Sequence, residues 1–499
     1  MAHFDNLFDS EDENDFDIIV VGGGLTGLTA AYNILERHVG LDVLILERNN
    51  AIGGRIISQT ESKFYYGHSL QKNITHMLDT FDIPKEFKID IGEKQKVLFT
   101  KNGPLENKLP SYIAGEIHYF LKAINSNSMD PKFKIYSAHE EAEDLSRISI
   151  DQLICRLVFL PQSRSICRTF ISLVCGINDT HYISALWVLV MLHGANGLLT
   201  RLKIVLGDEH RYFVKNGMMS IAEELVRRIE DENGEMHCKE QVNTIQFNND
   251  RVYVTTDIRT YRCNHVIIAV PPQESVLIQI QPEPPINLIH CQNLFQCSKT
   301  IFFNATYKTP FWHTQFSGDI ISTWNSKTKL RIAYDASSWS KRESVIAGFI
   351  SESNQTSRAS IDLFDVLNAC FKSSQSRNYI DYKETQGNSM NVPKPDNINH
   401  HINPMFTPWG RIFFASSEYA PTWPGTVDGA LESGNISACL LLMRTRPQAL
   451  SPLEIISCTN QRVKPRPSQP IRAAMLQYIC LTVNVIIFLS YFRAAYQND

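Results

Sequence analysis

Near the start of the chain, the arrangement of hydrophobic and polar positions predicts a strand, a helix and a second strand in succession. The stretch FDIIVVGGG, residues 16–24, is a mostly apolar run that ends in glycines, which is typical of a strand buried on both faces of a parallel sheet. Residues 25–37, LTGLTAAYNILER, have apolar positions at helical spacing, and residues 41–47, LDVLILE, form a second apolar run. The pattern therefore predicts a βαβ unit.

Further along the chain, the pattern becomes helical and later returns to strands. From about Pro84 to Val205 the apolar spacing is helical or mixed. Residues 213–229 indicate a turn that leads into an amphipathic helix, and strand-like runs follow at residues 251–256, 265–272 and 299–307. Because sheet-forming stretches return so late, we predict a discontinuous nucleotide-binding domain that is interrupted by a second, substrate-facing domain.

The predicted fold class is α/β plus α+β, in two domains. The nucleotide-binding domain is Rossmann-like and takes up residues 17–92, 205–295 and 400–448. A mixed sheet and helices make up the substrate domain, residues 93–204 and 296–399. The length of 499 residues agrees with this division, because a single domain usually has about 100–200 residues.

Composition narrows the class of protein without naming a function. Hydrophobic residues make up 43% and charged residues 20% of the chain, as in globular proteins with a large core. The formal net charge of -4, without a long lysine or arginine run, argues against a nucleic-acid partner. The 11 cysteines form no CxxC pair and no cysteine–histidine group at zinc spacing, so we expect neither a disulfide framework nor a metal site.

The two ends of the chain differ in character. Residues 1–16 are acidic and lack the basic and apolar regions of a secretory signal, so we predict a flexible tail. At the other end a proline-rich linker, residues 449–471, precedes a span at 472–493 that contains about twenty uncharged residues in a row, enough to cross a bilayer as a helix. We predict a transmembrane tail anchor that leaves the body of the protein in the cytosol; a buried C-terminal helix is the alternative.

Three glycines after the first predicted strand carry the clearest chemical signal. Gly22, Gly24 and Gly27 form the pattern GxGxxG between a strand and a helix. In such a unit the glycines give a tight turn, close approach of the backbone to a pyrophosphate, and close packing of the helix on the strand. The helix N-terminus attracts phosphates, and Glu47 at the end of the second strand is placed to accept hydrogen bonds from ribose hydroxyls. A dinucleotide is the predicted ligand.

Beyond this unit the chain resembles the flavin-containing monoamine oxidases. Gly53, Gly54 and Arg55 follow Glu47 as they do in flavin amine oxidases. Four later stretches are similar to segments of that family, namely ISALWVLVMLHGANGLLTRL from residue 183, VIIAVPP from 266, TPFW from 309 and GRIFFASSEYAPTWPGTVDGALESGNISA from 410. They cover nearly the whole chain in the family's order, so the resemblance implies FAD as the cofactor.

The resemblance also implies which residues hold FAD. Around the ADP half, the matching positions are Gly22, Gly24, Leu25, Thr26, Gly27, Glu47, Gly54 and Arg55. The backbone of Val242 matches the position that meets the adenine, and Gly67 and Ser69 match a segment beside the flavin. Along the ribityl chain and the flavin ring, the corresponding residues are Glu418, Gly425, Thr426 and Val427.

The family's reaction sets the expectations for activity and partners. An amine is oxidised by hydride transfer from its α-carbon to the flavin, dioxygen reoxidises the flavin and gives hydrogen peroxide, and the imine hydrolyses to an aldehyde. The expected partners are a small-molecule amine, dioxygen and a membrane, and a homodimer is an open option. By analogy with the family, the anchor points to the mitochondrial outer membrane, with the endoplasmic reticulum as the alternative.

Some positions depart from the family's pattern around the cofactor. The family attaches its flavin through a glycine-cysteine-tyrosine run, and counting back from the C-terminal motif places Gly387, Asn388 and Ser389 at these positions. An amide cannot form the thioether, so we predict noncovalent FAD. Asn49 likewise stands where the family usually has an arginine beside the adenosine.

Other departures concern the substrate side. Thr426 stands where the family has the second tyrosine of an aromatic cage around the amine. Tyr419 or Trp423 could replace that tyrosine, although such residues more often pack the domain. Alignment on TPFW places Phe302 where much of the family has a lysine that holds a water against the flavin. Lys299, the candidate catalytic residue, lies three residues earlier and could take this role only if a bulge or gap corrects the strand register.

These departures leave three hypotheses. The first is an FAD-dependent amine oxidase. The second is a flavin-binding pseudoenzyme with a structural, scavenging or interaction role, because the cysteine, both tyrosines and the lysine in register are missing. The third is a flavin oxidase for a different substrate, such as a polyamine or an amino acid. Reduction of the bound flavin by an amine under anaerobic conditions would separate the enzyme from the pseudoenzyme.

Overall fold

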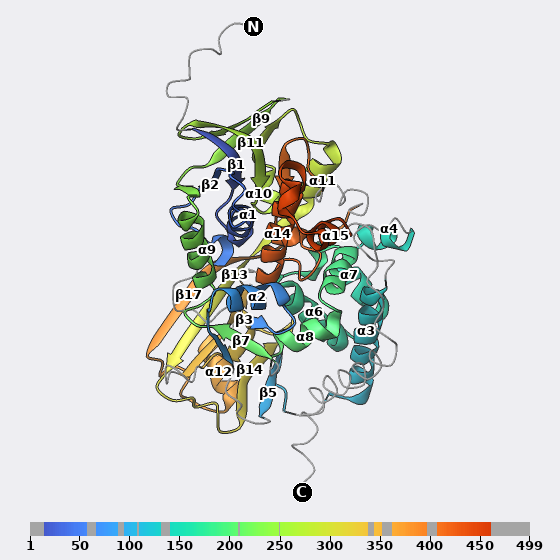
Figure 1. Cartoon of the computed structure of the whole chain (residues 1–499). Helices are drawn as coiled ribbons and strands as arrows, with labels where there is room; N and C mark the ends of the chain where they lie inside the picture. Colours follow the sequence, from blue (N-terminus) through green and yellow to red (C-terminus); the bar gives the residue numbers. More distant parts are fainter. Residues whose placement is uncertain are drawn as a thin grey trace. The chain divides into compact units, whose positions relative to one another are not determined.

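The computed structural model describes residues 14–56, 66–87, 94–106, 109–130, 140–207, 210–248, 250–337, 344–351, 362–396 and 407–460 (Figure 1). Within them the chain forms two compact units. The first unit contains the described parts of residues 1–57, 219–296 and 400–464. The second unit contains the described parts of residues 58–218 and 297–399. Each unit therefore combines segments that lie far apart in the sequence.

A largely parallel sheet forms the centre of the first unit. Its strands run in the order β12-β9-β10-β11-β1-β2-β8, and β18 also pairs with β11. The pairs among β18, β11, β1, β2 and β8 are parallel, whereas β10 is antiparallel to both β9 and β11. The strands are β1 (Asp15–Val21), β2 (Val43–Glu47), β8 (Glu235–Cys238), β9 (Val242–Phe247), β10 (Val252–Thr256), β11 (Thr260–Ile268), β12 (Gln279–Gln281) and β18 (Ile412–Phe414).

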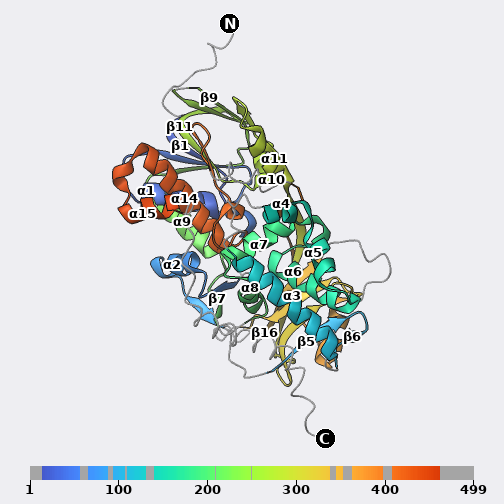
Figure 2. The same cartoon turned by 90° about the vertical axis from the view of Figure 1, so that its right-hand side faces the viewer.

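The first βαβ unit has the structure that its apolar pattern predicts. Every residue of β2 is buried, and so is every residue of β1 from Ile18 onward. The connecting helix α1 (Leu25–Leu35) packs against both strands and also against α9 (Met219–Asp231) and α14 (Val427–Thr445), and Figure 2 shows the three helices side by side. Because neighbours surround it, α1 is buried over most of its length rather than on one face.

The contact between α1 and α14 depends on a glycine. A Cβ added to Gly434 would collide with the carbonyl oxygen of Thr26 and would lie 2.9 Å from Thr29 Cβ. The backbone of α14 therefore approaches the backbone of α1 more closely than any side chain at residue 434 would permit. This contact ties α14, near the end of the described residues, to α1, near their beginning.

A second sheet dominates the second unit, with the strand order β17-β13-β16-β15-β14-β5-β6. Its strands are β5 (Gln95–Thr100), β6 (Gly103–Pro104), β13 (Phe295–Tyr307), β14 (Phe316–Ser322), β15 (Leu330–Asp335), β16 (Ser344–Ser351) and β17 (Asp381–Pro393). The helices are α2 (Lys72–Thr80), α3 (Ser111–Met129), α4 (Glu140–Arg147), α5 (Ile150–Leu157), α6 (Pro161–Cys175), α7 (Ala185–Gly194), α8 (Leu198–Val205) and α12 (Leu363–Phe371), with a short 3₁₀ helix, η3 (Thr180–Tyr182). A core of aromatic and aliphatic side chains, including Phe303, Trp312 and Leu367, lies between this sheet and α12.

One part of the chain belongs to a different unit from the one that we predicted. We assigned residues 17–92 and 205–295 to the nucleotide-binding domain. In the structure, β3 (Tyr66–His68) and β4 (Lys85–Phe87) pair antiparallel with β7 (Arg211–Val214) and form a separate three-stranded sheet. These strands belong to the second unit, because their backbone hydrogen bonds are made to one another and not to the parallel sheet.

The structure also corrects the predicted ends of the body. β1 begins at Asp15, inside the stretch that we predicted as a flexible tail. Part of the predicted linker at 449–471 is a helix, α15 (Pro452–Asn460), which packs against α14. Arg37 at the end of α1 holds it in place, because its guanidinium donates to the Glu454 carboxylate and to the Ala449 carbonyl.

The predicted anchor at 472–493 lies outside the described residues. Among the helices that are described, none is by itself both long enough and apolar enough to span a bilayer. The consecutive helices α7 and α8 meet these criteria only as a pair, and they are bent by 75° relative to each other.

Candidate functional site

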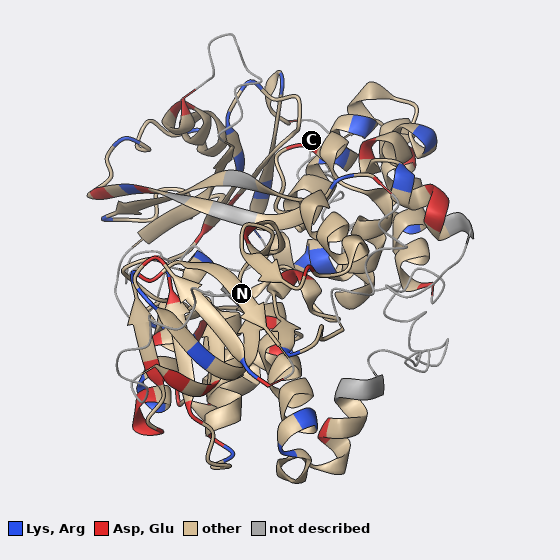
Figure 3. Cartoon of the chain, turned by 90° about the horizontal axis from the view of Figure 1, so that it is seen from above, with Lys and Arg blue, Asp and Glu red and all other residues tan. Residues whose placement is uncertain are grey.

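Charged residues of both signs are interspersed along the described ribbon (Figure 3), so the buried charges are the informative ones. In the first unit, buried carboxylates include Glu47, which is 7% exposed, Glu240, which is 4% exposed, and Glu418, which is fully buried. Each of them lies in or beside a segment that the sequence assigned to a cofactor.

The glycine turn after β1 needs glycine at two of its three motif positions. Gly22 has a φ of 110°, in the left-handed region that favours glycine, and a Cβ there would lie 3.0 Å from the carbonyl oxygen of Ala269. A Cβ on Gly27 would collide with the carbonyl oxygen of Gly22. The first glycine therefore makes the turn and the third brings α1 onto the strand.

Gly24, the second glycine of the motif, leaves space open. It is the N-cap of α1 and has extended backbone angles that any residue could adopt. A Cβ built on it would meet nothing closer than Gly54 Cα, at 3.8 Å. No side chain caps the helix, and the first-turn N–H groups of a helix are the donors that bind anionic groups. The fold by itself therefore does not require glycine at this position, and a Cβ there would point into open space beside the helix N-terminus.

Glu47 lies at the carboxyl end of β2 and is fixed from two sides. Its Oε2 accepts a hydrogen bond from the Gly23 N–H at 2.8 Å. Its Oε1 accepts from the backbone N–H and the side-chain amide of Asn49, at 2.8 and 2.7 Å. Each carboxylate oxygen has more than one acceptor position, so these bonds orient Glu47 and leave it able to accept from a ligand hydroxyl. The role of Asn49 was not anticipated from the sequence.

A second glycine pair lies along the first. The N–H of Gly53 donates to the carbonyl of Gly23 at 2.8 Å, and a Cβ on Gly54, whose φ is 59°, would lie 3.1 Å from Gly24 Cα. The short 3₁₀ helix η1 (Gly54–Ile56) begins here and carries Arg55. The motif around Gly53 and the motif around Gly24 therefore form one surface.

Arg55 makes a bidentate ion pair with Glu418, which lies 363 positions further along the chain. Its Nη1 is 2.5 Å from Oε1 and its Nη2 is 3.0 Å from Oε2 of Glu418. Ser416 and Ser417 also donate their hydroxyls to Oε2, at 2.6 and 2.8 Å. Paired, planar contacts of this kind are the strong form of charge-assisted hydrogen bond. The C-terminal motif is thus joined to the glycine motifs through a buried carboxylate.

The rest of the C-terminal motif forms the N-terminus of α14. Thr426 is its N-cap, with Oγ1 accepting from the Gly429 N–H at 3.2 Å and donating to the Trp423 carbonyl at 2.7 Å. Gly425 has a φ of 74°, and Val427 is the first helical residue. The Thr426 hydroxyl is therefore committed to the helix cap.

Two aromatic residues considered as replacements for the missing tyrosine are buried. Tyr419 and Trp423 are each 4% exposed, and burial raises the pKa of the Tyr419 hydroxyl above its ordinary value. Such burial favours a role in packing the domain, which is the commoner role of such residues. Neither residue is assigned to the site.

Val242 begins β9, and the residues just before it are hydrogen-bonded to the end of β2. The N–H of Glu240 donates to the Glu47 carbonyl at 3.0 Å, and the N–H of Lys239 donates to the Asn49 carbonyl at 2.9 Å. The start of β9 is therefore held at the carboxyl end of β2. The parallel strands β11, β1 and β2 end at this same edge, where ligands bind in open α/β sheets.

Comparison with known proteins identifies the family. A family model described as flavin containing amine oxidoreductase matches residues 25–442. The chain belongs to this family. Two relatives are a probable flavin-containing monoamine oxidase A of Dictyostelium discoideum, 25% identical over 84% of this chain and 96% of the relative, and the flavin-containing amine oxidase A of Canis lupus familiaris, 24% identical over 85% and 84%.

Solved structures of the flavin-containing amine oxidoreductases share the fold. A putrescine oxidase bound to putrescine superposes with a TM-score of 0.74 at 20% sequence identity. A cyclohexylamine oxidase from Brevibacterium oxydans IH-35A superposes with a TM-score of 0.75 at 18% sequence identity. Each covers 86% of this chain, and this chain covers 99% of each. The mixed α/β architecture of this chain is therefore that of FAD-dependent amine oxidases.

The family implies FAD, and the residues of the first unit fit it. The space beside Gly24 would be filled by a Cβ at that position and suits a pyrophosphate, and Glu47 suits a ribose. Leu25, Thr26, Gly27 and Val427 belong to the first turns of two helices whose N-termini favour negative charge. The structure brings together in one unit all predicted contacts of the ADP half and of the C-terminal motif.

Other predicted residues lie in the second unit. Gly67 is in β3, where a Cβ would lie 2.5 Å from the ring of Tyr212, and the Ser69 N–H donates to the His210 carbonyl at 3.4 Å. Lys299, Asn388 and Ser389 belong to strands β13 and β17, but their side chains lie outside the described part of the structure.

The Phe302 side chain is packed inside the second unit. It is 6% exposed and lies edge-on to Phe349 of β16, with ring centroids 5.0 Å apart. On the β17 side, a Cβ added to Gly387 would collide with the same ring. Phe302 thus takes up space between two strands at the position where much of the family has a lysine.

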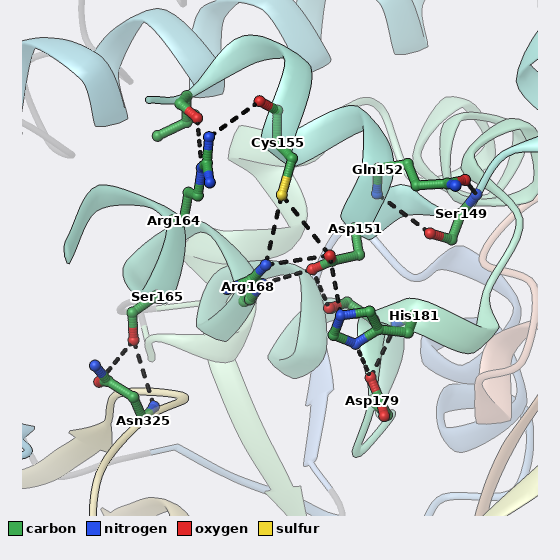
Figure 4. Close-up of polar contacts among 12 residues, drawn as sticks. Ser149, Asp151, Gln152, Cys155, Arg164, Ser165, Arg168, Asp179, His181 and Asn325 are labelled. Atoms are coloured by element: carbon green, nitrogen blue, oxygen red, sulfur yellow. Dashed lines mark hydrogen bonds and ion pairs between the residues drawn. The ribbon is translucent and has the colours of Figure 1, made fainter. Parts of the chain in front are cut away.

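A cluster of polar side chains around Asp151 lies in the second unit (Figure 4). Asp151 of α5 accepts hydrogen bonds from Arg168 Nε at 2.5 Å, Arg168 Nη2 at 3.1 Å and Thr180 Oγ1 at 3.1 Å. His181 lies between Asp151 Oδ2, 3.1 Å from Nε2, and Asp179 Oδ1, 2.6 Å from Nδ1. The cluster joins α5, α6 and η3, and no group of side chains suited to holding a metal ion occurs within the described stretches. Its contacts are those of a structural cross-link.

Proposed function

We propose that this chain is an FAD-dependent amine oxidase that holds its cofactor noncovalently. The observation that carries the proposal is the meeting of four groups at the carboxyl edge of the parallel sheet: the bare Gly24, the N-terminus of α1, Glu47 and the Arg55–Glu418 pair. Each matches a part of the ADP half of FAD in charge and hydrogen-bonding capacity. The relatives are named as amine oxidases, which supports the class of reaction.

The residues of the chain would bind the cofactor along its length. The first-turn N–H groups of α1 would receive the pyrophosphate oxygens, since no side chain at Gly24 lies between them. Glu47, oriented by Gly23 and Asn49, would accept hydrogen bonds from the ribose hydroxyls. Arg55, held in one orientation by Glu418, would supply a fixed positive charge to the phosphates.

Bound FAD would supply the redox chemistry, which is the oxidation of an amine to an imine with transfer of the electrons to dioxygen; hydrogen peroxide would form, and the imine would hydrolyse to an aldehyde. The N-terminus of α14, capped by Thr426, offers a positive dipole end that favours negative charge nearby. The protein's remaining task is to position a neutral amine and exclude water.

Noncovalent attachment is tested by denaturation. Asn388 occupies the cysteine position and has no thiol to give a thioether. Acid precipitation of the purified yellow protein is expected to leave all flavin in the supernatant. Flavin that remained with the precipitated protein after washing would contradict the proposal.

Catalysis is tested by anaerobic reduction of the bound flavin. The purified holoprotein is mixed with a panel of monoamines, diamines, polyamines and amino acids, and the oxidised flavin band is followed. Bleaching by an amine, with hydrogen peroxide appearing once air is admitted, supports the oxidase. The class that bleaches it identifies the substrate class. A flavin that dithionite reduces but no amine does would contradict the proposal.

A flavin-binding pseudoenzyme is the second candidate function. Two observations favour it: the Thr426 hydroxyl is engaged in capping α14, and the Phe302 ring is packed between β16 and β17. Neither side chain can do what a tyrosine or a lysine would do at these positions. In that case the protein would bind the flavin, but no amine would reduce it.

We also propose that residues 472–493 anchor the chain in a membrane with its body in the cytosol, on the mitochondrial outer membrane or, as the alternative, the endoplasmic reticulum. The uncharged length of this segment supports the proposal. Resistance of the full-length protein to extraction with alkaline carbonate, together with co-localisation with one of the two membranes, is the expected result.

A further inference from the structure

A second buried carboxylate, Glu240, lies one step away from the proposed ribose ligand. It is 4% exposed, and its Oε2 accepts hydrogen bonds from Tyr261 Oη at 2.8 Å and Thr256 Oγ1 at 3.2 Å. Its Oε1 is 3.6 Å from His237 Nδ1 and 3.7 Å from Arg259 Nη2. Side chains from β8, β10, the following turn and β11 therefore converge on this one carboxylate.

The hydrogen positions in this cluster follow from its distances. Tyr261 is fully buried, and burial together with the Glu240 carboxylate raises the pKa of its hydroxyl, so the hydroxyl stays protonated and donates to Glu240. His237 Nδ1 lies 2.7 Å from the same phenol oxygen. Because the phenol hydrogen is directed to Glu240, Nδ1 of His237 must carry a hydrogen of its own and donate it to the oxygen of Tyr261. The three side chains form a directed chain of hydrogen bonds that ends on Glu240.

The backbone at this point connects the cluster to the proposed cofactor site. Lys239 has a φ of 62°, a left-handed conformation that is costly for a lysine and persists where its surroundings fix it. The N–H groups of Lys239 and Glu240 donate to the carbonyls of Asn49 and Glu47. Val242, the predicted neighbour of the adenine, follows two residues later. The turn at Lys239 and Glu240 therefore holds the end of β2 through its backbone, and Tyr261 holds the Glu240 side chain of the same turn.

We propose that Glu240 is a positioning residue for the adenosine end of FAD, acting through the backbone on Glu47 and Val242. This inference rests on the proposed binding of FAD in the first unit. Loss of the carboxylate would release the turn at Lys239, and Glu47 would lose a fixed position relative to Gly23. Because Glu47 would then be less ordered, the adenosine half of FAD would bind more weakly, and the environment of the flavin ring would be unchanged.

The test is an affinity measurement on the full-length, detergent-solubilised protein. Flavin is removed, and FAD is titrated back into the wild type, E240Q, Y261F and the double variant while flavin fluorescence is followed. We expect each single variant to bind FAD about tenfold more weakly, the scale of one lost hydrogen bond to a charged group. The double variant should lose little more, because both substitutions break the same chain of hydrogen bonds.

Two further readouts separate positioning from a general loss of stability. ADP, which contains only the adenosine end, should compete with FAD about tenfold more weakly in E240Q, and the absorption spectrum of the FAD-saturated variant should match the wild type. The matched control is D15N, because Asp15 pairs with Arg262 at 2.6 Å at the opposite end of β1 from the glycine turn. D15N should lower the unfolding temperature and leave both affinities unchanged.

Each unfavourable result has a distinct meaning. Wild-type protein that does not rebind FAD would contradict the proposed function itself. Rebinding in the wild type with unchanged FAD and ADP affinities in E240Q would overturn the positioning role, even if E240Q unfolded at a lower temperature. Fully additive losses in the double variant would also overturn it, since they would show that Tyr261 and Glu240 act separately.

Discussion

At the scale of single residues, the proposed cofactor site depends on buried charges that hold one another. Glu418 has no exposed surface and accepts hydrogen bonds from Arg55 and two serine hydroxyls. Removing one partner of such a pair leaves an uncompensated charge in the interior, which costs more than the pair itself contributes. Arg55 therefore stabilises the fold through Glu418, in addition to the phosphate-binding role that we propose for it.

These two roles of Arg55 can be separated by mutation. R55A should lower the free energy of unfolding of the flavin-free protein by about 3 kcal/mol, because Glu418 stays buried without its partner. The double variant R55M/E418Q should recover much of that loss but should still bind FAD weakly. Urea unfolding and FAD titration measure the two effects. If R55A were as stable as the wild type, the pair of Arg55 with Glu418 would not contribute to the free energy of unfolding as we predict.

A second prediction at this scale concerns acid stability. Burial by itself raises the pKa of Asp151, but the hydrogen bonds and charge of Arg168 outweigh burial, and the pKa lies below its ordinary value. Because the folded-state pKa is below the unfolded one, the stabilisation is complete above about pH 4 and is lost as the pH falls through the folded pKa.

The acid prediction is checked by urea unfolding at a series of pH values. D151N should be less stable than the wild type at neutral pH, and this difference should shrink as the pH falls below 4. The control is D381N, since Asp381 pairs with Lys383 at the surface with a 52% exposed side chain. A difference for D151N that stayed constant with pH would contradict the assignment.

At the scale of elements, the fold depends on how closely α14 approaches α1. G434A should lower the free energy of unfolding by about 1–3 kcal/mol, because the added methyl meets the backbone of α1 at Thr26. G115A is the matched control: Gly115 lies inside α3, where a Cβ would meet nothing within 4 Å. That replacement should stabilise the protein by about 0.5–1 kcal/mol. Thermal unfolding of both variants checks the contrast.

Local elements could be predicted from the sequence, and their partners only in part. The apolar runs of β1 and β2 and the helical spacing of α1 predicted the first βαβ unit because these patterns are local. The separate sheet of β3, β4 and β7 was missed, because antiparallel pairing between residues 66 and 213 leaves no local signal. The Glu240 cluster was missed for the same reason, since Tyr261 and His237 are ordinary strand residues until they pair.

At the scale of the whole molecule, α15 is the last element in the described part of the chain. The contacts of Arg37 with Glu454 and Ala449 hold α15 on α14, so a soluble form should keep this helix. A protein that ends at Asn460 should leave the membrane fraction, bind FAD and unfold at the same temperature as the full chain. One that ends at Leu450 should unfold at a lower temperature. Equal unfolding temperatures for the two would show that α15 adds nothing to the body.

The pairing of Arg55 with Glu418 also has a consequence for the timing of synthesis. A ribosome completes the glycine turn, Glu47 and Arg55 within the first 55 residues, but Glu418 and α14 emerge only after more than 400. Until then the guanidinium lacks its carboxylate and α1 lacks the helix that covers it. If FAD binds as proposed, we therefore expect the flavin to assist folding only once the last fifth of the chain has been made.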